Sequence, residues 1–154
     1  MGAIHNFIRS GDLTKITELI KVDPDVINAK DEKGFPAIVL ASYHGNSEIT
    51  KLLIKGGVEI DAKDVAGNTA LMGVAFKGFK EIAKLLLDAG ANANSTNFGK
   101  ATPLIYAATF GHLNMAQVLI DFGADKTVKD MKGNTAADIA KTQGNMKIYE
   151  LLLA

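Results

Sequence analysis

Residues 63–95 read KDVAGNTALMGVAFKGFKEIAKLLLDAGANANS, and the rest of the chain repeats this pattern. The stretch opens with residues 64–67, where Asp at the first position and Gly at the fourth are typical of a type I turn. Thr69 can cap a first helix, which Gly78 then ends by supplying a left-handed residue. A second helix is predicted over residues 80–89. The unit is therefore a turn followed by two short helices, with an apolar side that it cannot bury alone.

The copies of this unit are in register along the chain. A glycine recurs every 33 residues, at Gly45, Gly78, Gly111 and Gly144. A threonine keeps the same spacing, at Thr69, Thr102 and Thr135. Self-similarity at this period, without insertions, predicts a helical solenoid in which each unit is buried only by its neighbours.

One unit carries most of a known repeat pattern, in Thr102-Pro103-Leu104 and in the later Gly111-His112. On these residues the chain resembles the ankyrin repeat family over nearly its whole length. The resemblance implies an all-α fold, an ankyrin-repeat solenoid of helix-turn-helix units with β-turn fingers. We divide the single domain, residues 1–154, into a cap unit and four repeats. The cap unit covers residues 1–29, and the repeats cover residues 30–62, 63–95, 96–128 and 129–154.

Several positions depart from the pattern and lead to specific expectations. Pro36 stands where threonine is usual, so the helix that follows it should lack a hydroxyl cap. In residues 97–100 the glycine comes one place early, which favours a type II turn with Gly99 at positive φ and a tip of different shape. We expect His5 on the polar side of the first helix. The histidine that the family carries after Thr-Pro-Leu is replaced by Val39, Met72, Ile105 and Asp138.

The composition of the chain limits its partners. Its 17 basic and 17 acidic side chains cancel, which disfavours nucleic acid and anionic membranes. It has no cysteine, and no run of about 18 apolar residues that could span a membrane. The first residues lack the pattern of a signal peptide. We therefore expect a cytoplasmic monomer with no membrane partner.

We find no candidate residues for catalysis, cofactor binding or metal binding. The three histidines, His5, His44 and His112, lie far apart in the repeat scheme, whereas a metal site needs ligands that converge. No nucleophile elbow, phosphate loop or pair of carboxylates stands out. The repeat spacing explains most of the 15 glycines as helix ends and turns. The expected protein is not an enzyme.

The resemblance also implies a binding surface, because ankyrin repeats contact partners through a concave face made of finger tips and first helices. The finger positions are Glu32, Lys33, Phe35, Val65, Asn68, Phe98, Lys100, Met131 and Lys132. The helix positions are Tyr43, His44, Phe76, Lys77 and Phe110. The chain has ten aromatic residues, seven Phe and three Tyr, and five of them belong to this set. Aromatic residues gathered on one surface favour binding. The other interpretation is that the rings only pack on one another.

We therefore expect a non-catalytic module or scaffold that binds another protein through this concave face. The alternative is a regulatory or stabilising subunit of a partner enzyme. A scaffold engineered from the family is disfavoured because the units differ so much, and single-stranded nucleic acid is disfavoured by the zero net charge. Phe76 is expected at the centre of the surface, between Tyr43 and Phe110. We place its ring outside the core formed by Leu71, Val74, Leu85 and Leu86.

Overall fold

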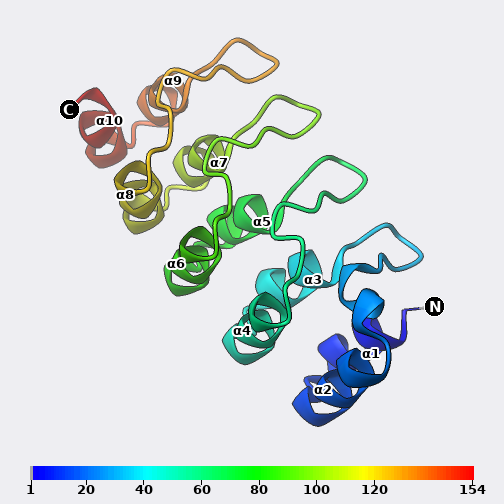
Figure 1. Cartoon of the computed structure of the whole chain (residues 1–154). Helices are drawn as coiled ribbons and strands as arrows, with labels where there is room; N and C mark the ends of the chain where they lie inside the picture. Colours follow the sequence, from blue (N-terminus) through cyan, green and yellow to red (C-terminus); the bar gives the residue numbers. More distant parts are fainter. Residues whose placement is uncertain (1) are drawn as a thin grey trace.

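The computed structural model describes residues 2–154, which fold into successive pairs of short helices (Figure 1). The first helices of the pairs are α1 (Ala3–Ser10), α3 (Ala37–Tyr43), α5 (Ala70–Lys77), α7 (Pro103–Thr109) and α9 (Ala136–Thr142). The second helices are α2 (Leu13–Val22), α4 (Ser47–Lys55), α6 (Lys80–Asp88), α8 (Leu113–Asp121) and α10 (Met146–Leu153). A 3₁₀ helix, η1 (Pro24–Asn28), follows α2. The all-α solenoid predicted from the sequence is confirmed.

Four loops project from one side of the stack, one before each of the last four pairs (Figure 1). We call these loops fingers 1 to 4, and they cover residues 30–36, 63–69, 96–102 and 129–135. The finger face is the side of the molecule formed by the fingers together with the first helices. Any residue that recurs at the repeat spacing returns to an equivalent place on this face.

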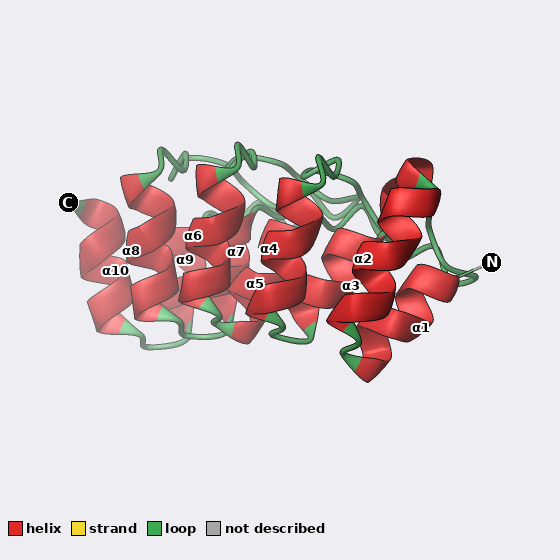
Figure 2. Cartoon of the chain, turned by 60° about the horizontal axis from the view of Figure 1, so that its bottom comes forward, coloured by secondary structure: helices red, strands yellow, loops and turns green. Residues whose placement is uncertain are grey.

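The core runs through the whole length of the stack, along which the helices lie side by side (Figure 2). First helices in the middle of the stack are buried most completely: every residue of α3 from Ala37 to Ser42 is buried. Small residues at equivalent positions, such as Ala75 and Ala108, are fully buried and let successive helices approach closely. Each unit therefore hides its apolar side against the units before and after it.

Side-chain caps set the start of most first helices as the sequence predicts. Thr69, Thr102 and Thr135 each accept a hydrogen bond from the amide three residues later. The helix after Pro36 begins without a side-chain cap, as expected. Gly78 ends α5 with a φ of 81°, in the left-handed region. These boundaries depend on neighbours in the sequence, and local patterns predict them well.

The expectation that finger 3 differs in shape is wrong. The Oδ1 atom of Asn97 accepts the amides of Gly99 and Ala101, both at 3.0 Å. Asp31, Asp64 and Asp130 accept the amides two and four residues later in the same way. The positive φ in finger 3 falls on Lys100, at 60°, and not on Gly99. The side chain that opens the turn fixes the backbone, so Lys100 takes the conformation that Gly34, Gly67 and Gly133 adopt elsewhere.

A second set of polar contacts joins neighbouring units on the loops that follow the second helices. The side chains of Asn28, Asp61 and Asn94 accept backbone amides of the next unit. The donors are the amides of Glu59, Asn92 and Asp125, at 2.8, 3.1 and 2.7 Å. We call these three contacts the amide ladder. It ties successive units together just before the fingers begin.

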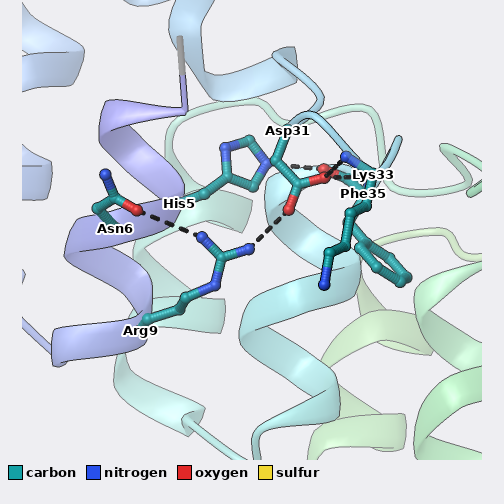
Figure 3. Close-up of polar contacts among 6 residues, drawn as sticks. All are labelled: His5, Asn6, Arg9, Asp31, Lys33 and Phe35. Carbon is teal, nitrogen blue, oxygen red and sulfur yellow. Dashed lines mark hydrogen bonds and ion pairs between the residues drawn. The ribbon is translucent and has the colours of Figure 1, made fainter.

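His5 is fully buried and does not lie on the polar side of α1 as the sequence analysis expects. Its Nε2 donates to the carbonyl oxygen of Phe35 at 2.7 Å, which ties α1 to finger 1 (Figure 3). A carbonyl oxygen can only accept, so Nε2 carries the hydrogen, and the buried Nδ1 has no partner among the described residues. Burial lowers the pKa of His5, against the opposing effect of its bond to Phe35.

Arg9, one turn after His5 in α1, joins the helix to the same finger. Its Nη2 donates to Oδ2 of Asp31 at 2.7 Å (Figure 3). Burial of Asp31 disfavours its charged form, but the amides of Phe35 and Lys33 and the guanidinium outweigh this effect and lower its pKa. The cap unit is thus attached to the stack by polar contacts as well as by its apolar side.

Lys100→Gly should raise the free energy of unfolding by about 0.5–1 kcal/mol, because glycine adopts positive φ without the steric cost that lysine bears. The measurement is urea unfolding of both proteins. Lys132→Gly is the control, since Lys132 occupies the position of Gly99 and has no positive φ. A Lys100→Gly protein that is less stable than the parent would contradict the assigned backbone conformation.

The free energy of unfolding should fall as the pH drops below about 6.5, the usual pKa of histidine in an unfolded chain. The unfolded chain takes up a proton at His5 there, whereas the folded chain, with its lowered pKa, resists protonation. His5→Gln keeps a donor for Phe35 but cannot titrate. Urea unfolding at pH 7.5 and pH 5.5 should show a smaller loss for the variant, and equal losses would refute this role of His5.

Candidate partner-binding surface

Four aromatic rings from three successive units lie in contact on the finger face. Phe76 lies at the centre, 4.4 Å from Phe110, 6.1 Å from Tyr43 and 6.5 Å from Tyr106, measured between ring centroids. We call these four residues the aromatic cluster. The expected placement of Phe76 between Tyr43 and Phe110 agrees with this geometry.

The repeat period explains how the cluster forms. Tyr43 and Phe76 hold the same position in consecutive units, near the ends of α3 and α5. Phe110 follows the last residue of α7 and pairs with Tyr106, one turn earlier, at 6.4 Å between centroids. Because the first helices stack directly on one another, side chains at matching positions meet.

The rings of the cluster remain accessible to solvent. Phe76 is 36% exposed, Tyr43 38% and Phe110 46%. None of the three belongs to the hydrophobic core of buried residues. The rings do pack on one another, as the second interpretation holds, but this packing leaves part of their apolar surface exposed to water. Such a surface favours binding.

A cation already lies over one of these rings. The Nζ atom of Lys77 is 4.7 Å from the centroid of the Tyr43 ring, which is within the range of a cation–π interaction. The attraction comes from the negative face of the aromatic ring. This contact shows that the exposed ring of Tyr43 can hold a positive group.

A pocket of about 490 Å³ opens beside the cluster, between α3, finger 2 and α5. Its lining includes Tyr43, Asp64, Gly73, Phe76 and Tyr106 and is mainly apolar. Gly73 makes room for it, because a Cβ there would lie 3.4 Å from Cδ1 of Tyr43 and a longer side chain would extend further. Glycine inside a helix costs roughly 0.5–1 kcal/mol relative to alanine, so the pocket exists at some expense of stability.

Most of the predicted finger positions are exposed. They are Glu32, Lys33, Val65, Phe98, Lys100, Met131 and Lys132. Val65 is 71% exposed and Phe98 70%, which places them at the tips. The ring of Phe98 lies over finger 2, where a Cβ at Gly67 would be only 3.0 Å from it. Within residues 2–154 no ring contact joins Phe98 to the aromatic cluster, so the tips and the cluster are separate parts of the face.

Two predicted finger positions are less exposed to solvent than expected. Phe35 is partly buried and packs against the core, because His5 binds its carbonyl oxygen and draws finger 1 onto α1. Asn68 is also partly buried, and its Oδ1 accepts hydrogen bonds from Asn97 at 2.8 Å and from the Tyr106 hydroxyl at 3.3 Å. Both residues line the pocket wall rather than a finger tip.

Among the predicted helix positions, His44 and Lys77 are exposed as expected. Leu85, which the sequence analysis places in the core, is only half-buried, whereas Leu86 is fully buried. The sequence analysis missed Tyr106 and Gly73. When the units are aligned at the 33-residue period, Gly73 and Tyr106 fall at the same repeat position as Leu40 and Ile139, and we call this position the Gly73 column. Such an alignment predicts both residues at this place on the face. Gly73 is the one residue of that column without a side chain.

No group of three or more His, Cys, Asp or Glu side chains within residues 2–154 is placed to hold a metal ion. None of the described helices is long and apolar enough to cross a membrane.

Comparison with protein families gives a match that spans most of the chain. The family model for ankyrin repeats (3 copies) matches residues 4–97 and, again, residues 74–154. No curated protein matches the chain.

Phe76→Ala should lower the free energy of unfolding by about 1 kcal/mol, the usual worth of aromatic pairs on a partly exposed ring. Leu86→Ala should cost about 2–5 kcal/mol, because it leaves a cavity in the core. Urea unfolding of the two variants and the parent makes the comparison. Equal losses would mean that the Phe76 ring is part of the core.

Proposed function

The chain belongs to the ankyrin repeat family, and from this premise we propose that it is a non-catalytic module that binds a partner protein through its finger face. Ankyrin repeats generally mediate interactions between proteins. The observation that carries the proposal for this chain is the aromatic cluster. Phe76, ringed by Tyr43, Tyr106 and Phe110, has the arrangement in which binding energy tends to concentrate.

The charges of the finger face support a partner with an acidic surface around the contact. Lys33, Lys100 and Lys132 are exposed on three of the fingers, and Lys77 lies beside the cluster. Glu32 is the one exposed carboxylate among the predicted contact positions. Rim charges of one sign steer a partner of the opposite sign and make the association rate depend on salt.

The proposal extends to how the module acts. The stacked units hold the aromatic cluster and the finger tips at fixed distances from one another, so the module offers its partner a rigid surface. Among the described residues we assign no catalytic role, no cofactor and no metal ligand. The division into a cap unit and four repeats, the monomeric state and the cytoplasmic location stay predictions.

A captured partner tests the proposal. Immobilised protein is used to isolate a partner from the native source, and the affinity of the purified pair is then measured by calorimetry. Phe76→Ala should weaken binding by about 2 kcal/mol, close to 30-fold, because it removes the central ring of the cluster. Glu81→Ala, on the exposed side of α6, is the control and should bind like the parent.

Unchanged affinity of the Phe76→Ala protein would refute the finger face as the binding surface. An activity assay on the captured partner, with and without the module, addresses the alternative of a regulatory or stabilising subunit. A change in that activity would favour the alternative, and no change would favour the scaffold.

A further inference from the structure

We propose that the pocket beside Gly73 receives an arginine side chain of the partner, whose guanidinium pairs with the carboxylate of Asp64. The inference rests on the proposed function, because it names one contact within the proposed binding surface. It follows from a comparison of equivalent places in successive units.

The chain contains an internal example of this contact one unit earlier. In finger 1, Oδ1 of Asp31 accepts the amides of Lys33 and Phe35, and Oδ2 accepts Nη2 of Arg9 at 2.7 Å (Figure 3). The aspartate thus uses one oxygen to shape the finger and the other to hold an arginine from the preceding unit. A charge-assisted bond of this kind is among the stronger hydrogen bonds.

Finger 2 has the same aspartate but no arginine. Oδ1 of Asp64 accepts the amides of Ala66 and Asn68, both at 2.9 Å. Ser42 stands one period after Arg9, and its hydroxyl donates to Ile38 within its own helix at 2.7 Å. No donor for Oδ2 of Asp64 is found in the described part of the chain. This oxygen is free to pair with a cation from outside.

Finger 2 is also where space opens for a long side chain. At the Asp31 site the column of Gly73 holds Leu40, and at the Asp130 site it holds Ile139. The remaining finger carries a neutral Asn97 in place of the aspartate, with Tyr106 in that column. Among the four fingers, an aspartate combined with a glycine in this column therefore occurs only at finger 2. The mid-helix glycine, unfavourable for α5 itself, gains an explanation.

The walls of the pocket suit an arginine better than other side chains. Tyr43 and Phe76 line the pocket with aromatic rings, against which a planar guanidinium and its aliphatic stem can pack. Asp64 is the one carboxylate among the lining residues, and no lysine or arginine lines the pocket. Lys77, whose Nζ lies over the Tyr43 ring, is exposed and does not line the pocket. An acidic side chain would be repelled by Asp64.

The test is a titration of the full chain with the peptide acetyl-Ala-Ala-Arg-Ala-Ala-amide, followed by NMR of the backbone amides. Saturable shifts are expected at Gly73 and Asn68, with millimolar affinity for so small a ligand. The peptide with citrulline in place of arginine has the same shape without charge, and should bind about tenfold more weakly. Equal binding of the citrulline peptide or of a leucine peptide would overturn the proposal in favour of an apolar occupant.

Three variants locate the contact. Asp64→Asn should keep the finger intact, because Asn97 makes the same turn in finger 3, and should lose the preference for arginine over citrulline. Gly73→Leu should abolish binding, because it places in the pocket the side chain that Leu40 carries at the equivalent position one unit earlier. Asp130→Asn is the matched control and should bind like the parent.

Arginine binding that survives Asp64→Asn, or no saturable shift in the parent, would refute this inference. Neither result would bear on the proposed function, which stands or falls with the effect of Phe76→Ala on the captured partner.

Discussion

Burial between neighbours is the constraint on which the rest of this structure depends. A pair of helices as short as α5 and α6 cannot hide its apolar side alone, so α5 lies between α3 and α7 with Leu71 and Val74 fully enclosed. Stacking of this kind turns the order of units in the sequence into their order in space. It is also what brings Tyr43 and Phe76 together, although they are a full period apart. The same packing thus forms the core and the surface that we propose for binding.

The finger turn shows how one local device serves different ends. In each finger an Asp or Asn side chain accepts two backbone amides, and the polar atoms that remain are left for other contacts. Asp31 uses its second oxygen for Arg9, while the Nδ2 atom of Asn97 donates to Asn68 and to the Tyr106 hydroxyl. The repeat therefore conserves backbone shape along the chain and varies the chemistry beside it. Differences between fingers are differences of neighbours rather than of fold.

The sequence predicts features that depend on one local signal, and fails where two local signals compete or where distant residues intervene. Helix caps such as Thr69 and the stop at Gly78 follow from local patterns, and the structure has them. The positive φ predicted for Gly99 is wrong because the side chain of Asn97 overrides the turn preference of the glycine. His5 looked polar because its acceptor, the carbonyl of Phe35, is 30 residues away. The sequence predicts three of the four positions of the aromatic cluster and misses Tyr106, and the pocket depends on the side chain that Gly73 lacks.

The amide ladder has a consequence for how the molecule responds to force. Its three hydrogen bonds, from Asn28, Asp61 and Asn94, each cross a single boundary between neighbouring units. Tension applied to the two ends of the chain loads these boundaries in series, so the weakest gives way first while the others stay closed. Because each unit is held only by its neighbours, we expect the chain to extend by one unit at a time.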